Sequence, residues 1–454
     1  MNCFKSYDIR GVVPDQLNED ISYGIGRAFM SEVDASAVCV GRDIRLSSEA
    51  IADALIQGLC EGGADIFDIG LCGTEEVYFH TFNKGFGGGI MVTASHNPAN
   101  YNGMKMVRKE ARPISGDNGL FEIRDRVALK RYETPVRTGQ RRELAARSEY
   151  VDFLLSLVDT DSFASLKILA NPGNGCAGPV VRALAEHLPF SFHFVHEEPD
   201  GTFPNGIPNP LLPDRREATS KAVVESGADL GLAWDGDFDR CFFFDENGDF
   251  IEGYYLVGLL ARSVLFHHPG SKIIHDPRLT WNTIDIVKAA GGVPVMSKTG
   301  HAFIKERMRQ EDAVYGGEMS AHHYFKAFGY CDSGMVPWLL VCEILSRTGQ
   351  SLSHLVRSMK SSYPVSGEIN LRVPDPQRAL AYVEEACRPL TQRIDKIDGL
   401  SMDLGDWRFN LRCSNTEPVV RLNVESKADE TLMKDKTSEL LSILEKFGEN
   451  KERS

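Results

Sequence analysis

The chain has 454 residues, of which 42% are hydrophobic and 25% charged; this is the balance of a folded globular protein and excludes a largely disordered one. The formal net charge is −14 and no block of Lys and Arg occurs, which argues against nucleic acid as a partner. We expect a chain of this length to form about three or four domains.

The sequence also argues against a membrane location. No run approaches the ~18 apolar residues of a membrane span, and the first residues form no apolar leader segment. We therefore expect a cytoplasmic protein with no membrane partner. Ten cysteines are scattered without a C-x-x-C pair, so we expect reduced, mostly buried thiols and no zinc ribbon.

The first segment alternates expected strands and helices. Residues 37–40 form an apolar strand, and Ser47 or Ser48 is placed to cap a helix over 49–61. Another strand is expected over 65–70, and a third from Gly87 to Val92. This alternation predicts a parallel sheet.

The loop after the third strand, residues 93–98 (Thr-Ala-Ser-His-Asn-Pro), is the first candidate site. Ligands bind beyond the carboxyl ends of strands in open α/β sheets, so the Ser95 hydroxyl is placed to carry a phosphoryl group. The alternative is an ordinary turn, because Ser, Asn and Pro are common turn formers.

The second segment repeats the pattern. A helix is expected over 150–158 and a strand over 166–170, followed by a glycine-rich loop. Residues 199–210 are so rich in Pro, Gly and Asn that they predict an ordered irregular loop. The apolar strand 230–234 then runs into 235–240 (Asp-Gly-Asp-Phe-Asp-Arg), and an Asn-Gly hairpin signal at 247–248 joins two further short strands.

Asp235, Asp237 and Asp239 alternate along the chain. In an extended conformation their carboxylates would share one face and converge on a cation, and oxygen ligands of this kind suit Mg²⁺. One alternative is a calcium loop ending at Glu246, which Arg240 disfavours because it stands where such a loop needs Gly. The other is an acidic surface cluster without a metal.

The third segment has expected strands over 272–275, 293–296 and 313–315, each followed by a polar loop. The last of these loops contains Glu318, Ser320, His322 and His323. A carboxylate beside hydroxyl or imidazole groups can bind vicinal sugar hydroxyls. Zinc is the rival ligand, but the two histidines lack a further Cys/His spacing pattern.

After residue 364 the pattern changes to half-exposed strands near 369–373, 407–412 and 419–424, with a final amphipathic helix over 427–447. This predicts a smaller α+β domain. Residues 412–421 offer two guanidiniums, two hydroxyls and an amide around a turn, a set that suits a phosphate dianion. Further cations follow expected strands elsewhere: Arg10, Arg42, Lys105, Arg278, Lys298 and His301.

With these motifs in place, the chain resembles the α-D-phosphohexomutase superfamily from end to end, and within it the bacterial phosphomannomutases. Residues 93–98 match its phosphoserine loop, 235–240 its metal loop, 317–325 its sugar loop and 412–421 its phosphate loop. One short motif is weak, but four in the family's order are highly specific. Many members have Gly where Ala321 stands here.

The resemblance implies an α/β fold in which three similar mixed α/β domains and a smaller C-terminal α+β domain surround a central active-site cleft. We expect a phosphoserine-bearing domain at 1–143, a metal-binding domain at 144–250, a sugar-recognition domain at 251–364 and a phosphate-binding domain at 365–454.

The resemblance also implies residue roles. Ser95 carries the exchangeable phosphoryl group and, with Asp235, Asp237 and Asp239, holds Mg²⁺. Arg10, Lys105 and His301 lie near the reacting oxygens, where one of them relays protons. The substrate-binding residues that it implies are Glu318, Ser320, His322, Arg412, Ser414, Asn415, Thr416 and Arg421. To these we add the donors Arg278 and Lys298, which follow expected strands.

The implied activity is that of an isomerase: mannose 6-phosphate and mannose 1-phosphate interconvert through a phosphoserine enzyme and a 1,6-bisphosphate. A hexose 1,6-bisphosphate is the expected activator, and GDP-mannose synthesis is the pathway that the resemblance suggests. Two other classes stay open, a Mg²⁺-dependent phosphatase and a non-catalytic phosphosugar-binding protein. Glucose and glucosamine phosphates are the competing substrates, and the oligomeric state is left open.

Overall fold

The structure is a computed structural model that describes residues 1–145, 147–413 and 419–448. The chain divides into two compact units: residues 1–251, 300–310 and 322–352 form unit 1, and residues 252–299, 311–321 and 353–454 form unit 2. Within the described ranges, no helix combines the length and the apolar character needed to cross a membrane.

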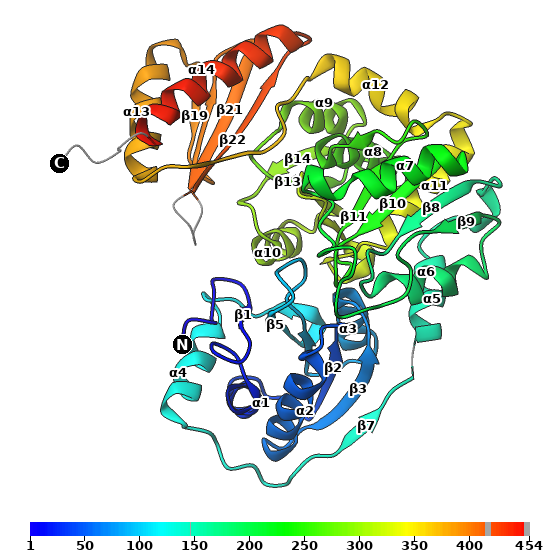
Figure 1. The fold of residues 1–454 in the computed structure, drawn as a ribbon, viewed down its shortest axis with the longest axis vertical. Helices are drawn as coiled ribbons and strands as arrows, with labels where there is room; N and C mark the ends of the chain where they lie inside the picture. The colour runs from blue at the N-terminus through cyan, green and yellow to red at the C-terminus, as the bar shows by residue number, and fades with distance from the viewer. Residues whose placement is uncertain (146, 414–418, 449–454) are drawn as a thin grey trace. The chain divides into compact units, whose positions relative to one another are not determined.

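Unit 1 begins with a mixed sheet, drawn in blue and cyan in Figure 1. Its strands are β1 (Ile9–Val12), β2 (Ala37–Arg42), β3 (Asp65–Leu71), β4 (Gly88–Val92), β5 (Tyr101–Arg108), β6 (Arg112–Pro113) and β7 (Arg141–Glu143). Their order is β1-β5-β4-β2-β3-β7, with β6 beside β5. Strands β4, β2, β3 and β7 run parallel to one another, whereas β5 runs antiparallel to β4 and β1.

Helices cover both faces of this sheet. They are α1 (Glu19–Glu32), α2 (Ser48–Glu61), α3 (Thr74–Asn83) and α4 (Leu120–Leu129). Val38 and Val40 of β2 pack in a cluster with residues of α1, α2 and α4, whereas Cys39 between them packs with Val77 of α3. Because successive side chains of a strand point to opposite faces, an unbroken apolar run is what a strand buried on both sides requires.

The second sheet of unit 1 has the order β12-β11-β10-β8-β9. Its elements are α5 (Arg147–Leu155), β8 (Lys167–Asn171), α6 (Ala177–Ala185), β9 (Ser191–Phe194), α7 (Glu217–Ser226), β10 (Leu230–Trp234), β11 (Cys241–Phe244) and β12 (Phe250–Ile251). Unit 1 also contains α10 (His301–Glu311), the antiparallel pair β16 (His323–Phe325) and β17 (Cys331–Asp332), and α11 (Val336–Thr348).

Unit 2 contains the remaining strands of the third segment and the whole C-terminal domain. The third segment contributes α8 (Gly253–His267), β13 (Lys272–His275), α9 (Trp281–Ala289), β14 (Val293–Met296) and β15 (Tyr315–Gly317). The C-terminal part has α12 (Leu352–Ser362), β18 (Ile369–Arg372), α13 (Pro376–Cys387), β19 (Arg393–Asp395), β20 (Leu400–Asp403), β21 (Trp407–Cys413), β22 (Val419–Ser426) and α14 (Glu430–Gly448). Its sheet, β18-β22-β21-β20-β19, is antiparallel and packs on α13 and α14.

The first three segments repeat one topology. In each, the first strand pairs in parallel with the second on one side and with the third on the other, giving β3-β2-β4, β9-β8-β10 and β14-β13-β15. The third strand of each set leads directly into a predicted functional loop: β4 precedes Ser95, β10 precedes Asp235 and β15 precedes Glu318. Three similar mixed α/β domains and a distinct α+β domain are therefore confirmed.

Some local expectations were wrong. Ser47 stands at the start of α2, but its side chain makes no capping bond to the helix, and the Ser48 hydroxyl donates to Asp43 instead. The helix expected over 150–158 is α5, which begins and ends three residues earlier, and the strand expected over 313–315 begins only at Tyr315. All ten cysteines are free thiols, as expected.

Candidate active site

The loop that carries Ser95 is held by one buried arginine. Arg45 donates to the carbonyl oxygens of Ser95 (2.9 Å) and Asn97 (2.6 Å), and also to those of Pro98 (2.7 Å) and Tyr101 (3.0 Å). Its side chain is fully buried and lies 3.3 Å from the Asp43 carboxylate, which also accepts a hydrogen bond from the Thr93 hydroxyl. Asp43 thus orients Arg45, and Arg45 fixes the path of the loop.

Ser95 itself has a strained backbone. Its φ is +50°, a conformation that costs a non-glycine residue about 1–2 kcal/mol. In this conformation its hydroxyl donates to Asp235 Oδ2 at 2.8 Å and lies 3.1 Å from His96 Nδ1. Strain that persists in such a well-bonded loop is typical of a functional position, where the surrounding contacts fix the geometry.

Asp235, Asp237 and Asp239 converge as the sequence predicts, but not in an extended strand. They lie in a turn between β10 and β11, in which the Phe238 N–H donates to the Asp235 carbonyl and Phe238 has a φ of +44°. The expectation of alternating side chains on one face was therefore wrong. The turn, not the period of a strand, brings the carboxylates together.

This acidic triad is buried and could bind a metal ion, since its ligand oxygens lie within 4.8 Å of one another. Asp237 Oδ1 and Asp239 Oδ1 are buried, and no donor in the described part of the chain bonds to them. Buried carboxylate oxygens without a partner are costly, so a cation fits the site as the missing partner. Among the described residues, Glu246 belongs to no metal-binding group, and this removes the support for the calcium-loop alternative.

Two cations already neutralise part of the triad. Lys105 Nζ donates to Asp237 Oδ2 (2.7 Å) and to Asp239 Oδ2, and Arg240 Nε donates to Asp235 Oδ2 (2.9 Å). Burial alone would lower the pKa of Lys105, but the carboxylates of Asp237 and Asp239 outweigh it and raise that pKa. Burial raises the pKa of Asp235 to about 7, against the opposing effect of Arg240.

Arg10 lies beside the same loop. Its guanidinium donates to the Asp8 carboxylate (2.8 Å) and to the Asn97 side chain (2.7 Å), and it is partly exposed. Burial lowers the pKa of Arg10, but Asp8 outweighs burial and raises it. The guanidinium is therefore permanently charged at the edge of the Ser95 loop.

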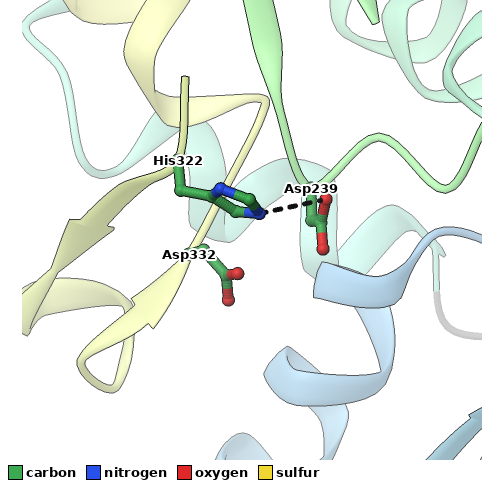
Figure 2. A group of neighbouring side chains, drawn as sticks. All are labelled: Asp239, His322 and Asp332. Atoms are coloured by element: carbon green, nitrogen blue, oxygen red, sulfur yellow. Dashed lines mark ion pairs between the residues drawn. The ribbon is translucent and has the colours of Figure 1, made fainter. Parts of the chain in front are cut away.

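His322, from the third segment of the sequence, lies beside the acidic triad in unit 1. His322 Nε2 lies 3.8 Å from Asp239 Oδ1, and Asp332 is the third member of the group drawn in Figure 2. Lys305 Nζ lies 2.6 Å from Asp332 and 3.9 Å from the centre of the Tyr78 ring. The Asp235–Asp237–Asp239 triad offers three carboxylates, whereas the group in Figure 2 offers two carboxylates and one imidazole, so the triad suits a hard cation such as Mg²⁺ better.

His301 begins α10, belongs to unit 1 and is partly buried. Burial, with help from the charges of Lys305 and Lys105, lowers its pKa to about 3. Burial and the nearby Arg240 also lower the pKa of His322. Both imidazoles are therefore neutral at pH 7 in this structure, whereas Lys105 and Arg10 are charged.

The predicted sugar-binding residues Glu318 and Ser320 lie in unit 2, around Arg278. Arg278 Nη2 donates to Asp276 Oδ2 (2.7 Å) and contacts Ser320 Oγ (3.3 Å) and Glu318 Oε1 (3.5 Å). The sugar-loop residue Ala321 is buried with a φ of +70°, which explains physically why Gly suits that position. Lys298 lies in the same unit and is exposed.

The phosphate loop belongs to unit 2 as well. Arg412 lies near the end of β21, one residue before Cys413, and Arg421 lies directly opposite it on β22 in the antiparallel ladder. Both approach the carboxylate of Glu368. The predicted ligands Ser414, Asn415 and Thr416 lie outside the described residues.

The structure adds three residues that the sequence did not assign: Arg45, Arg240 and Glu368. Arg240 was recognisable in principle, because it directly follows the last Asp of the motif and an adjacent cation is expected near three carboxylates. Arg45 carried a weaker signal, its position just after a strand. Glu368 carried none, because it lies far along the chain from the arginines it contacts. No zinc group forms from Glu318, Ser320, His322 and His323 in the part of the chain that is described.

Known proteins match this chain along nearly its full length. Profiles of the phosphoglucomutase/phosphomannomutase family match at 1–132 (alpha/beta/alpha domain I), 148–248 (domain II), 252–363 (domain III) and 368–440 (C-terminal domain). A phosphomannomutase of Salmonella montevideo is 58% identical over 452 residues, which cover 98% of this chain and 99% of that one.

Solved structures agree with these matches. A phosphoglucomutase/phosphomannomutase family protein from Burkholderia thailandensis has a TM-score of 0.89 at 32% identity, covering 99% of this chain and 98% of that chain. An N-acetylphosphoglucosamine mutase of Aspergillus fumigatus, solved with GlcNAc-6P and magnesium, shares the fold with a TM-score of 0.61 at 13% identity, covering 98% and 96% of the two chains.

The four-domain fold and these relatives define a mutase, an enzyme of the isomerase class. The chain belongs to the phosphoglucomutase/phosphomannomutase family.

Proposed function

We propose that this enzyme interconverts mannose 6-phosphate and mannose 1-phosphate, with Ser95 as the phosphoryl carrier. The observation that carries the proposal is the Ser95 hydroxyl, which lies 2.8 Å from Asp235 at the edge of a buried acidic triad with unsatisfied oxygens. The 58% identity to a protein named phosphomannomutase supports mannose as the sugar.

The cation proposed for the triad is Mg²⁺. Asp235, Asp237 and Asp239 would hold it together with an oxygen on Ser95, and such hard oxygen donors are the ligands that Mg²⁺ prefers. When bound, it would neutralise charge on the transferring phosphoryl group. The orphaned Oδ1 atoms of Asp237 and Asp239 support this assignment.

The transfer breaks the bond between phosphorus and the Ser95 oxygen and forms one between phosphorus and a free sugar hydroxyl oxygen. The sugar hydroxyl gives up a proton, and the departing Ser95 oxygen takes one up. We assign this relay to His301, because its imidazole is neutral at pH 7 and the negative charge of the transferring group would offset the burial and the lysine charges that lower its pKa. Lys105 and Arg10 stay cationic and stabilise the charge of the transferring group. The resulting 1,6-bisphosphate returns its other phosphate to Ser95, so a trace of hexose 1,6-bisphosphate activates the unphosphorylated enzyme.

Recognition of the substrate is assigned to unit 2. Glu318 accepts hydrogen bonds from the ring hydroxyls, and Ser320 donates or accepts them. The phosphate that is not transferred is bound by Arg412 and Arg421 together with the loop residues Ser414, Asn415 and Thr416. Arg278 and Lys298 of unit 2 and His322 of unit 1 complete the proposed set. A phosphate dianion offers the same oxygens at position 1 or position 6, so one clamp serves both orientations.

The test is Ser95→Ala. We expect this variant to bind substrate but to show no mutase turnover. Turnover is measured by ³¹P NMR with Mg²⁺, a trace of hexose 1,6-bisphosphate and mannose 1-phosphate. The matched control is Ser156→Ala, because Ser156 lies on the exposed surface of the same unit. Near wild-type turnover by Ser95→Ala would contradict the phosphoserine proposal.

The same ³¹P NMR assay of the wild type, with glucose 1-phosphate in a parallel sample, distinguishes two competing outcomes. Faster conversion of glucose 1-phosphate would make glucose the preferred substrate, which is a specific alternative because the matched family covers both sugars. Release of inorganic phosphate without any need for the bisphosphate would identify a phosphatase instead.

A further inference from the structure

A single carboxylate lies among three arginines of unit 2. Glu368 immediately precedes β18, and its Oε2 accepts a hydrogen bond from Arg412 Nη2 at 2.9 Å. The same carboxylate lies 3.6 Å from Arg278 Nη1 and 3.9 Å from Arg421 Nη1. Glu368 therefore joins the arginine beside the sugar loop to both arginines of the phosphate loop.

Most of this cluster is shielded from water, and its described residues balance in charge. The side chains of Glu368 and Arg412 are 15% and 14% exposed and that of Arg278 is 5% exposed, whereas Arg421, at 36%, faces solvent. Among the described residues, Arg278, Arg412 and Arg421 carry three positive charges, and Asp276, Glu318 and Glu368 carry three negative charges. Burial raises the pKa of Glu368, but Arg278, Arg412 and Arg421 outweigh burial and lower it, so the carboxylate is charged at pH 7.

Two donors in the cluster are still available. Arg278 Nε and Arg412 Nε are buried and have no hydrogen-bond partner among the described residues. A guanidinium has five donors in a fixed fork, and here Glu368 takes an outer Nη of Arg412 and leaves Nε for another acceptor. An arriving anion can thus bind these arginines while Glu368 keeps its own contacts.

We propose that Glu368 is the resident counter-anion of the phosphate clamp, a positioning residue that holds the three arginines together and limits how tightly they grip phosphate. This proposal rests on the function proposed above for Arg412 and Arg421. Three like charges in one shielded cluster repel one another, and Glu368 removes that repulsion before substrate arrives. It also repels the bound phosphate dianion.

A weaker grip benefits this reaction in particular. The bisphosphate intermediate must leave one orientation in the clamp and enter the other before the second transfer. Tight binding of the intermediate as such deepens an energy well and does not speed the reaction. Glu368 therefore trades affinity for release, and its loss should affect binding and turnover in opposite directions.

The test replaces Glu368 by Gln, which removes the charge at constant size. We expect E368Q to bind inorganic phosphate about tenfold more tightly by isothermal titration calorimetry, because one repulsive charge is lost from a poorly solvated site. KM for mannose 1-phosphate should fall, and kcat should fall with it. The matched control is E385Q, which removes the same charge from an exposed position on α13 and should leave all three values unchanged.

A merely structural role predicts the opposite signs, a weaker phosphate affinity and a higher KM. E368D keeps the charge but draws it away from the arginines, so its phosphate affinity should lie between those of the wild type and E368Q. Should E368Q fail to fold, E368D decides the matter, since an affinity below that of the wild type overturns the proposal. An unchanged phosphate affinity of folded E368Q overturns it as well.

Failure of the underlying function gives a different result. In that case the wild-type enzyme converts no mannose phosphate, whatever the phosphate affinity of the variants. If the wild type turns over and E368Q binds phosphate no more tightly, only the role of Glu368 is wrong.

Discussion

Arg45 shows how one side chain can fix the path of a whole loop, here the loop that carries Ser95. Its two Nη atoms donate to four carbonyl oxygens of residues 95–101, and these acceptors lie at fixed angles to one another. The planar fork of a guanidinium can reach them together, whereas an ammonium is a compact point donor. The position of Ser95 Oγ over Asp235 depends on this arrangement.

We therefore predict that Arg45→Lys lowers kcat/KM about 100-fold, since displacement of a reacting group by about 1 Å costs roughly that much. The charge is conserved, so the loss reports geometry and not electrostatics. The measurement is steady-state mutase kinetics beside Arg131→Lys, an exposed arginine in the same domain. Unchanged kinetics for Arg45→Lys would show that the loop keeps its path without the fork.

At the residue scale, the residues that could be predicted from the sequence are those that lie within one short motif. Ser95 and the three aspartates were named correctly as a cluster because each motif is local and follows an apolar strand. Arg45 and Glu368 escaped because their partners lie far away in the sequence, Glu368 being 44 residues from Arg412. The turn at Phe238 escaped because alternation of Asp is equally compatible with a strand and with a loop.

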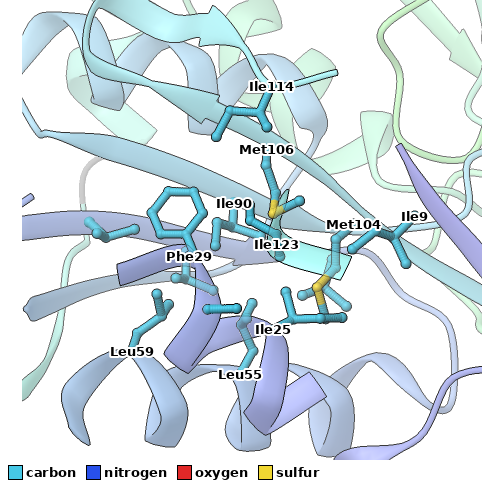
Figure 3. Close-up of a cluster of buried hydrophobic side chains, with 14 of the residues drawn as sticks. Ile9, Ile25, Phe29, Leu55, Leu59, Ile90, Met104, Met106, Ile114 and Ile123 are labelled. Carbon is cyan, nitrogen blue, oxygen red and sulfur yellow. The ribbon is translucent and has the colours of Figure 1, made fainter. Parts of the chain in front are cut away.

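At the scale of elements, the crossing of α1 and α2 is set by glycine. A Cβ atom added at Gly26 would lie 2.4 Å from the Leu55 carbonyl oxygen, and one added at Gly58 would lie 2.2 Å from that of Tyr23. The two backbones therefore touch. Ile25 and Phe29 of α1 and Leu55 and Leu59 of α2 then reach the same layer of the core beneath the sheet, as Figure 3 shows.

From this contact we predict that Gly58→Ala lowers the free energy of unfolding by about 3 kcal/mol. A methyl group pressed against backbone has no flexible neighbour to displace, so the helices must separate. Alanine's higher helix propensity returns only about 1 kcal/mol. Chemical denaturation checks the value against Gln57→Ala, an exposed position one residue away; equal stability of the two variants would show that the helices can shift apart at little cost.

Element type was more predictable than element position. Short apolar runs bounded by turn residues predict buried strands, and β2, β4, β8, β10 and β13 are such runs. Ends were displaced where capping and strand pairing, not hydrophobicity, decide them, as at α5 and β15. The domain boundaries expected at 143/144, 250/251 and 364/365 stay predictions, because the ranges matched by the family profiles leave gaps between them and fix no exact boundary.

At the scale of the whole molecule, buried histidines make the stability of the fold depend on pH on the acid side of neutrality. Burial lowers the pKa of His80 to about 4 and that of His323 to about 3. It also lowers the pKa values of His96 and His275. In every case the folded state holds the neutral imidazole, while the unfolded chain titrates near pH 6.5.

The sign of the effect follows from proton counting. Below about pH 6.5 the unfolded chain binds protons that the folded histidines do not, so stability is full above that pH and falls as the pH is lowered. For His80 the loss extends from about pH 6.5 down to its folded pKa of about 4. The buried histidines act in the same direction, whereas burial raises the pKa of Glu75 to about 8 and that of Asp235 to about 7, which stabilises the fold on acidification. The histidine effect is therefore best tested at one histidine.

We predict that His80→Gln reduces this acid sensitivity. His80 is 1% exposed on α3, and within the described ranges its Nδ1 has no hydrogen-bond partner. A group with its shift should account for about 1 kcal/mol of the stability lost between pH 7.5 and pH 5.5. Melting midpoints at the two pH values should therefore differ less in the variant than in the wild type, while His187→Gln, at an exposed position, should keep the wild-type difference. If His80→Gln keeps the full wild-type difference, the protons that destabilise the fold are bound elsewhere, because removal of the imidazole removes the only group at that position that can take one up.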